Sequence, residues 1–225
     1  MSDATYVSRG GQKLAHALRE FAVDVRGLVC ADLGCSTGGF TDCLLQHGAS
    51  KVYSVDTAYG ELAWKLRKDP RVVVMERSNA LHTEPPEQVD VVVVDLGWTT
   101  QRQLVPVALG WLKQPAREDD AEHAGVGDRP GSSGERRGPC IITLIKPHYE
   151  AKHTALAAEA AKHRGILPDE LAEQVMRTVV DELPALGVRV AGLTRSPLRG
   201  GSKADGNMEW LAELEAVRHA SRGTD

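Results

Sequence analysis

The sequence lacks the features that would place a chain in or across a membrane. None of its apolar runs approaches the roughly 20 residues that a membrane span needs. The first residues, Met1-Ser2-Asp3-Ala4, contain neither the basic nor the apolar region of a signal peptide. No basic amphipathic stretch is present either, which argues against a membrane-lytic role. We therefore expect a cytoplasmic protein with no membrane partner.

Cysteine is scarce, and its spacing excludes a metal or disulfide framework. The chain has 4 cysteines in 225 residues, with no C-x-x-C pair and no His/Cys cluster at zinc spacing. A chain without an export signal meets a reducing compartment. We expect Cys30, Cys35, Cys43 and Cys140 to be free thiols, three of them packed in or beside a buried turn, and we expect no metal.

A net positive charge, which proteins that bind nucleic acid usually carry, is missing as well. The formal net charge is -4, which counts against a nucleic-acid partner. Its distribution is uneven, because the acidic residues concentrate in residues 114–139 and 169–182. The basic residues gather in two segments, Arg9, Lys13 and Arg19 near the start and Arg195, Arg199 and Lys203 near the end. Charge therefore leaves an RNA partner open and gives no reason to expect DNA.

Length and composition indicate one main domain. A chain of 225 residues with 42% apolar content can bury one sizeable core, and no internal repeat is evident. We expect an N-terminal arm and helix over residues 1–22, the main domain over 23–215 and a C-terminal tail over 216–225. Residues 114–139 hold almost no apolar side chains and cannot offset the entropy of ordering, so we interpret them as a flexible surface insertion.

Short β-branched runs alternate along the chain with stretches of helical spacing. The runs that predict buried strands are 28–33, 51–56, 71–75, 89–96, 140–145 and 188–193. The stretches that predict helices are 13–21, 40–46, 61–67, 101–112 and 168–183. Strands that alternate with helices of this length predict a doubly wound α/β sheet.

A glycine-rich turn follows the first predicted strand and opens the next helix. It reads DLGCSTGGF over residues 32–40, and such a turn lets a ligand approach backbone amides closely. The spacing G-x-x-x-G-G differs from the G-x-G-x-x-G of a dinucleotide site and does not suit a pyrophosphate. A tight turn that binds no ligand is the alternative.

An acidic residue, Asp56, ends the second predicted strand. At this position a carboxylate can accept hydrogen bonds from both hydroxyls of an adenosine ribose. The turn and Asp56 together predict an adenosine-containing ligand. Asp32, at the tip of the first strand, either faces the ammonium of that ligand or orients the turn, and the sequence leaves both roles open.

Several blocks of sequence occur in a distinctive order between residues 6 and 212. They are YVSRGGQKL at 6–14, DLGCSTGGFTD at 32–42, VYSVD at 52–56 with YG at 59–60, ERSN at 76–79, VVVVD at 91–95, KPHYE at 146–150, and SP at 196–197 with GNMEW at 206–210. In this order they resemble the FtsJ-like ribose methyltransferases and, within them, the TlyA (hemolysin-like) rRNA methyltransferase family. The first two blocks are the most specific.

The resemblance implies a Rossmann-like class I methyltransferase sheet, mostly parallel with an antiparallel last strand, that binds S-adenosyl-L-methionine. It implies a Lys-Asp-Lys-Glu tetrad, which falls here on Lys13, Asp95, Lys146 and Glu209. It also implies cofactor contacts from Gly38, Phe40, Asp56, Asn79 and Asp95, to which the glycine turn adds Asp32, Gly34, Ser36 and Gly39.

The chain departs from the family pattern in three places. Family members usually bear a small N-terminal RNA-binding domain, whereas this sequence begins almost at the arm. A serine- and phenylalanine-containing loop usually follows the strand that ends at Asp95, but residues 96–100 read LGWTT. The polar insertion before Lys146 is the third departure. These differences affect the target pocket more than the cofactor pocket.

The tetrad suits methyl transfer to a ribose oxygen, because the site must align the acceptor hydroxyl and remove its proton. We assign Lys146 to steering and deprotonating the 2'-hydroxyl and Asp95 to positioning that lysine. A lysine acts as a base only if its pKa falls well below about 10.4, and a neighbouring cation lowers it, so we expect Lys13 beside Lys146. Lys13 and Glu209 would hold the nucleotide.

The predicted function is 2'-O-methylation of RNA, with ribosomal RNA or a ribosomal subunit as partner. The alternatives are a methyltransferase acting on a small molecule or a protein, and a catalytically silent module that binds RNA or the ribosome. His148, His47 and His82 are isolated and lack metal spacing. We interpret Trp98 and Tyr149 as packing residues in preference to base-stacking ones. The oligomeric state is not determined by the sequence.

Overall fold

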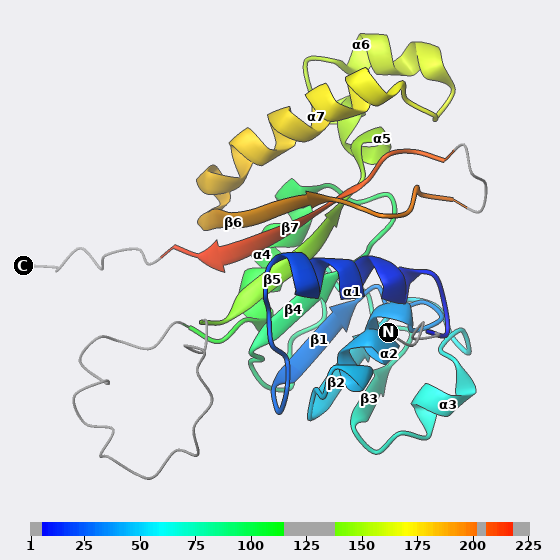
Figure 1. The fold of residues 1–225 in the computed structure, drawn as a ribbon, viewed down its shortest axis with the longest axis vertical. Helices are drawn as coiled ribbons and strands as arrows, with labels where there is room; N and C mark the ends of the chain where they lie inside the picture. The colour runs from blue at the N-terminus through cyan, green and yellow to red at the C-terminus, as the bar shows by residue number, and fades with distance from the viewer. Residues whose placement is uncertain (1–5, 115–137, 202–205, 218–225) are drawn as a thin grey trace, which may run out of the picture.

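Seven strands form a single sheet with helices on both faces in the computed structural model, which describes residues 6–114, 138–201 and 206–217 (Figure 1). The strands are β1 Val29–Leu33, β2 Lys51–Val55, β3 Val72–Met75, β4 Val91–Val94, β5 Cys140–Ile145, β6 Val188–Arg195 and β7 Trp210–Ala216. The longer helices are α1 Gly10–Glu20, α2 Gly39–Gln46, α4 Gln101–Trp111 and α7 Asp169–Glu182. The shorter ones are α3 Trp64–Arg67, α5 Pro147–Glu150, α6 Ala157–Ala160 and the 3-10 turns η2 Ala151–His153, η3 Ala161–His163 and η4 Leu183–Leu186.

The strand order is β3-β2-β1-β4-β5-β7-β6. Strands β1 to β5 pair in parallel, whereas β7 runs antiparallel to both β5 and β6. This arrangement confirms the predicted α/β sheet, mostly parallel with an antiparallel last strand. All six predicted runs are strands, β1 to β6. The sequence pattern does not delimit β7, whose sequence WLAELEA is rich in the helix formers Leu, Ala and Glu. Pairing on both sides overrides that local preference.

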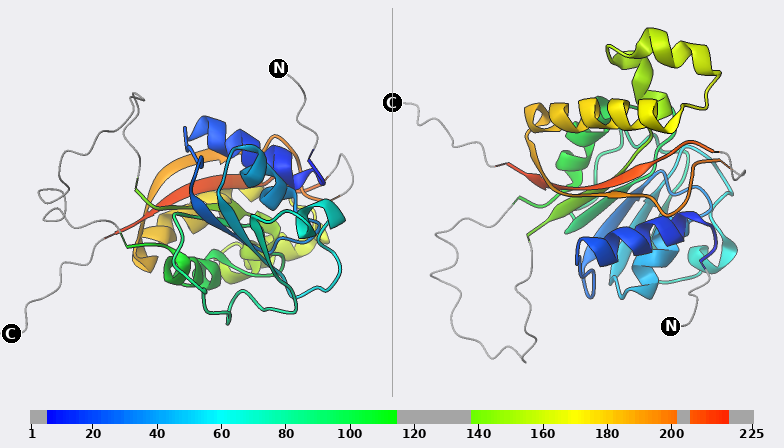
Figure 2. Two further views of the ribbon diagram at one scale, coloured as in Figure 1. Left: turned by 90° about the horizontal axis from the view of Figure 1, so that it is seen from below. Right: turned by 45° about the horizontal axis from the view of Figure 1, so that its top comes forward.

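Helices cover both faces of the sheet, as both views in Figure 2 show, and each face carries its own hydrophobic layer. Helices α1 and α2 cover one face, where Leu14, Leu18, Phe40 and Leu44 pack on Cys30, Val52, Val93 and Ile142. Helices α4 and α7 cover the other face, where Leu104, Trp111, Leu171 and Val175 pack on Ala31, Val92, Ile141 and Ile145. Successive residues of β1, β4 and β5 point to opposite faces, and both faces are covered by helices. These strands therefore read as mostly apolar runs without a polar–apolar alternation. All four cysteines are buried.

Helix α1 approaches the start of α2 very closely, and glycine makes this approach possible. A Cβ atom on Gly39 would lie 2.9 Å from the backbone nitrogen of Gly11 and 3.2 Å from Cα of Gly10. The arm before α1 is also tied to α2, because Val7 N donates a hydrogen bond of 2.8 Å to Asp42 Oδ2. The N-terminal arm and α1 therefore pack directly against the end of the glycine turn and the start of α2.

The loops that follow β4 and β5 are joined by a buried carboxylate. Thr100 and Gln103 form a capping box at the start of α4. Glu150, at the end of α5, accepts a hydrogen bond of 2.9 Å from Gln101 N in the first turn of the same helix. Burial raises the pKa of Glu150 to about 7, although the hydrogen bond from Gln101 opposes the rise. This contact holds the two loops together.

Parts of the chain differ from the expected organisation or lie outside it. The sequence pattern leaves residues 147–163 unassigned, and the structure forms α5, η2, α6 and η3 there. Each of these is only three or four residues long, which is too short for a helical period to be recognised. The predicted insertion over 114–139 and tail over 216–225 fall almost wholly outside the described residues. Within the described part, no helix is long and apolar enough to cross a membrane.

We expect Gly39→Ala to lower the free energy of unfolding by about 1 to 3 kcal/mol, because the added methyl group must push α1 away from α2. Gly110→Ala is the matched control, since this glycine lies in α4 and a methyl group added there would meet nothing within 4 Å. That variant should gain up to about 1 kcal/mol from helix propensity alone. Urea unfolding of both variants checks the contrast, and equal stabilities would contradict the close contact.

We expect Glu150→Gln to change the pH dependence of stability. A carboxyl group whose pKa is raised from 4.5 to about 7 favours the folded state when protonated, so its contribution is lost as pH rises from about 4.5 to 7. Glutamine keeps the acceptor for Gln101 N but does not titrate. The variant should exceed the parent by on the order of 1 to 3 kcal/mol at pH 8 and match it at pH 5. Urea unfolding of both proteins at each pH measures this difference, and a difference in free energy of unfolding that stays constant from pH 5 to 8 would contradict the prediction.

Candidate active site

The candidate site lies at the carboxyl ends of four neighbouring strands. The glycine turn follows β1, Asp56 follows β2, Asp95 follows β4 and Lys146 follows β5. Because these strands are parallel and adjacent, their carboxyl ends meet at one edge of the sheet, where α/β proteins bind ligands. The structure thus confirms that Asp95 and Lys146 each close a buried strand.

Lys146 is held by two acceptors from the loop after β4. Its Nζ atom lies 2.5 Å from Asp95 Oδ1 and donates a hydrogen bond of 3.2 Å to the carbonyl oxygen of Leu96. The side chains of Lys146 and Asp95 are 15% and 24% exposed, so the pair is shielded but can be reached from solvent. Such shielding strengthens the attraction between the two charges.

Lys13 and Glu209 form a second ion pair, which is more deeply buried. Lys13 on α1 places Nζ 2.5 Å from Glu209 Oε2, and Glu209 is only 3% exposed. Gly200 leaves room for this carboxylate, because a Cβ atom there would overlap Glu209 Oε1. A buried charge is costly unless it is paired in this way.

The two ion pairs lie side by side across the β5–β7 pairing. Ile145 is opposite Trp210 in this antiparallel ladder. Continuing the same register by one residue brings Lys146 opposite Glu209. The structure therefore brings all four residues of the predicted tetrad to one place. It differs from the expectation in one respect, since Lys13 and Lys146 each face a carboxylate instead of forming an isolated pair of like charges.

His148 also belongs to this group, although its sequence context predicts an isolated histidine. Burial lowers the pKa of His148 to about 4, and the positive charges of Lys146 and Lys13 add to the effect. The imidazole is therefore neutral at physiological pH. Its position two residues after Lys146 in the KPHYE block is the signal that could have identified it.

The backbone of the glycine turn is held in an unusual conformation and is fastened to Asp56. Gly34, Ser36 and Gly38 have positive φ angles of 92°, 47° and 98°. The carboxylate of Asp56 accepts hydrogen bonds of 2.8 Å from Ser36 N and from Ala58 N. Because each carboxylate oxygen can accept two hydrogen bonds, Asp56 retains acceptor capacity for a ligand.

The glycines of this turn are required by protein packing. A Cβ atom on Gly34 would lie 2.9 Å from the Asp95 carbonyl oxygen, and one on Gly38 would lie 2.7 Å from Leu62 Cδ1. Glycine here does not by itself identify a ligand. The indication of a ligand rests instead on the exposed Ser36 and the half-buried Asp56.

Two of the expected cofactor residues face the protein interior. Asp32 is fully buried and accepts hydrogen bonds from Thr41 N, at 2.8 Å, and Thr41 Oγ1, at 2.7 Å. Burial raises the pKa of Asp32 to about 7, and the charges of Asp95 and Asp56 add to the rise against the hydrogen bonds of Thr41. These hydrogen bonds show that Asp32 orients the turn and the start of α2. Its other oxygen, Oδ1, is buried without a hydrogen-bond partner in the described residues, so the contact with the ammonium of the ligand stays a prediction.

The ring of Phe40 is also buried, at 3% exposure, and packs beneath Gly10 of α1, where it does not face the ligand side of the turn. The approach of α1 to α2 covers the ring, so the expected cofactor contact of Phe40 stays a prediction that its backbone would have to fulfil. Asn79 is exposed, and its Oδ1 accepts a hydrogen bond of 3.0 Å from Leu81 N. It remains on the same rim as Asp56.

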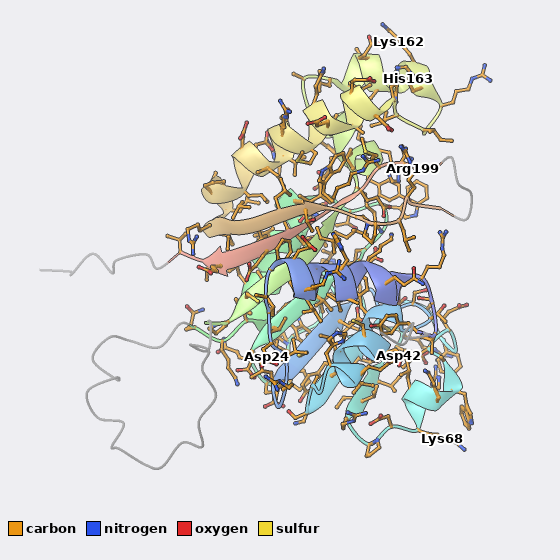
Figure 3. All side chains as sticks on the ribbon, in the orientation of Figure 1. Asp24, Asp42, Lys68, Lys162, His163 and Arg199 are labelled. Atoms are coloured by element: carbon orange, nitrogen blue, oxygen red, sulfur yellow. The ribbon has the colours of Figure 1, made fainter. Side chains whose placement is uncertain are left out.

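The basic residues of the N-terminal arm and of the β6–β7 connection meet near the tetrad. The guanidinium group of Arg9 donates a hydrogen bond to the carbonyl oxygen of Gly201. Arg199, labelled in Figure 3, forms a two-point ion pair with Asp169 at 2.9 and 2.6 Å. The two basic segments noted in the sequence therefore converge, although Lys203 lies outside the described residues.

Comparison with known proteins identifies the family. A family model described as FtsJ-like methyltransferase matches residues 6–165. The chain is 37% identical over 98% of its length to YqxC of Bacillus subtilis, a candidate rRNA methyltransferase, and covers 69% of that protein. It is 35% identical over 95% of its length to the 16S/23S rRNA (cytidine-2'-O)-methyltransferase TlyA of Mycobacterium tuberculosis, again covering 69% of the relative.

A solved structure of a candidate hemolysin from Streptococcus thermophilus superposes with a TM-score of 0.76 at 32% identity, over 96% of this chain and 69% of that one. The matched family model spans the glycine turn, Asp56, Asp95 and Lys146. This chain therefore belongs to the FtsJ-like methyltransferase family, and within it to the group that contains TlyA.

Proposed function

We propose that this chain transfers a methyl group from S-adenosyl-L-methionine to a ribose 2'-hydroxyl of ribosomal RNA. The observation that carries the proposal is the Lys146–Asp95 ion pair beside the Lys13–Glu209 pair, next to the glycine turn. The relative from Mycobacterium tuberculosis is named for the same reaction on cytidine of 16S and 23S rRNA. Because ribosomes are assembled in the cytoplasm, the proposed substrate places the reaction there.

The residues at the rim fit this cofactor. Asp56, with acceptor capacity left on its carboxylate, would bind the ribose hydroxyls of the adenosine. The exposed backbone around Ser36 and the side chains of Asn79 and Asp95 would contact the remainder. S-adenosyl-L-methionine supplies an electrophilic methyl group on its sulfonium. The direct contacts from Asp32 and from the Phe40 ring are not part of the proposal, because both side chains are buried.

Lys146 has the position needed to align the acceptor hydroxyl. Two acceptors, Asp95 Oδ1 and the Leu96 carbonyl, fix the direction of its side chain. A fixed nitrogen at the mouth of the cofactor site holds the hydroxyl oxygen in line. Once the Lys146 ammonium has released its own proton to solvent, the neutral amine takes up the proton that the hydroxyl must lose. Asp95 is then the residue that orients Lys146, and it would lie near the methyl group of the bound cofactor.

Lys13 and Glu209 have a different task, because the Glu209 carboxylate is almost completely buried. This ion pair fixes α1 against β7 and contributes one positive and one negative charge to the wall of the target pocket. Arg9, which lies on the same arm and contacts Gly201, is placed to bind a phosphate of the RNA. The net charge of -4 does not oppose this, because Arg9 brings a positive charge to the β6–β7 connection.

We expect Lys146→Ala to reduce methyl transfer to ribosomal subunits by at least about a hundredfold, because the group that aligns and deprotonates the hydroxyl is removed. Cofactor affinity should remain within about twofold. The assay is transfer of labelled methyl followed by digestion of the RNA to nucleosides, which must release a 2'-O-methylated nucleoside. Lys113→Ala is the matched control, since Lys113 forms a comparable ion pair with Asp90 at 2.7 Å away from the site. Full activity of Lys146→Ala would contradict the assignment.

The same assay separates the alternative functions. If the parent chain binds S-adenosyl-L-methionine and labels a protein or a small molecule but no RNA, the acceptor is wrong while the cofactor site stands. If it binds RNA and no cofactor, the chain is a silent RNA-binding module.

We expect Asp56→Ala to weaken S-adenosyl-L-methionine binding by about ten- to a hundredfold, because hydrogen bonds from the ribose to a charged acceptor are lost. The turn also loses the contact to Ser36 N. Isothermal titration calorimetry measures the change directly. Asp24→Ala serves as control, because Asp24 pairs with Arg26 at the surface (Figure 3). An unchanged dissociation constant for Asp56→Ala would place the adenosine elsewhere.

A further inference from the structure

Trp98 is the most exposed large apolar side chain in the described part of the structure. Its ring is 80% exposed, and its backbone has a φ angle of 63°. Positive φ is rare for a bulky residue other than glycine and is unfavourable. A tryptophan that only filled a core would be buried, and glycine would fit this backbone better. The conformation is therefore maintained while the ring faces solvent, which points to a ligand.

The loop that carries Trp98 is anchored at both ends. Asp95 N donates a hydrogen bond of 3.1 Å to the Leu33 carbonyl at the end of β1. At the other end Thr100 caps α4, and Gln101 N is bound by Glu150 from the loop after β5. Only four residues separate these anchors, so the ring is presented by a short connection between fixed points. A preorganised surface of this kind binds a ligand at low entropic cost.

Three rings form a row beside the reacting lysine. The ring centroids of Trp98 and Tyr149 are 4.8 Å apart with planes tilted by 38°, and those of Tyr149 and His148 are 4.0 Å apart. Lys146 Nζ lies 6.0 Å from the centroid of the Tyr149 ring. The exposed end of the row is Trp98, and the other end is the half-buried, neutral imidazole of His148. An aromatic surface therefore adjoins the place where the hydroxyl would bind.

We propose that Trp98 and Tyr149 form the surface on which the base of the methylated nucleotide stacks. This inference rests on the proposed function, because a ribose held at Lys146 brings its own base, one glycosidic bond away, to the neighbouring rings. Every base has a π face that stacks on aromatic side chains, and unpaired RNA bases are commonly bound in this way. The two ion pairs beside the rings favour a polar nucleotide over an apolar protein segment. The interpretation of these two residues as packing residues is thereby replaced.

The test compares Trp98→Gly and Trp98→Phe with Trp64→Ala. Glycine removes the ring and suits the positive φ, so this variant should melt at or above the temperature of the parent. Phenylalanine keeps a smaller stacking surface. Trp64 on α3 is a matched control, because it is 69% exposed but follows β2, which β1 separates from β4 and its Trp98 loop.

We expect Trp98→Gly to raise KM for ribosomal subunits by about tenfold or more, with S-adenosyl-L-methionine affinity unchanged. The KM of Trp98→Phe should stay within about threefold of that of the parent, and the KM of Trp64→Ala should equal that of the parent. As a binding readout, cytidine monophosphate should quench the fluorescence of the parent but not that of Trp98→Phe. Ribose 5-phosphate, which has no base, should quench neither.

Each other outcome has a definite meaning. An unchanged KM in Trp98→Gly, or equal quenching by ribose 5-phosphate, would overturn the stacking surface. Loss of a dimer in Trp98→Gly with an unchanged KM would assign the ring to self-association and overturn it as well. If the parent labels no RNA but cytidine monophosphate still quenches Trp98 selectively, the stacking surface is supported and the proposed acceptor fails.

Discussion

The buried ion pair between Lys13 and Glu209 connects the first helix to the start of the last strand, 196 residues apart in the chain. Neither charge could stay buried without the other, because an unpaired charge in this environment is strongly destabilising. The pair therefore requires α1 to lie on β7, Gly200 to leave room for the carboxylate, and Gly39 to admit α1 against α2. These contacts fix how the segments at the carboxyl edge of the sheet lie relative to one another.

The residues proposed to bind the cofactor and those proposed to bind the target come from different segments of the chain. The proposed cofactor side consists of the turns that directly follow β1 and β2, where Asp32 and Asp56 organise the backbone through hydrogen bonds to amides. The target side is assembled from the arm, the loops after β4 and β5, and the β6–β7 connection. Ion pairs and the contact of Glu150 with α4 hold these segments together.

The sequence was informative where the chain is locally repetitive or carries a compact motif. Six strands and five helices were recognised from their periods, and Asp95 and Lys146 were placed at strand ends because polar residues close apolar runs. It was uninformative for β7, whose Leu, Ala and Glu residues favour a helix in isolation, and for the short helices after Lys146. The burial of Asp32 and of the Phe40 ring could not be foreseen, because it depends on how α1 covers α2.

By itself the sequence determined the α/β class and the glycine turn, because these depend on local period and on a short motif. Its resemblance to a known family predicted the tetrad of Lys13, Asp95, Lys146 and Glu209. Only the tertiary structure decided which charges are partners, that Lys13 pairs with Glu209 and Lys146 with Asp95. It also decided that His148 is neutral beside both lysines and that Trp98 is exposed next to Tyr149. Such contacts join residues distant in sequence, and their energies depend on burial and distance, which no local pattern specifies.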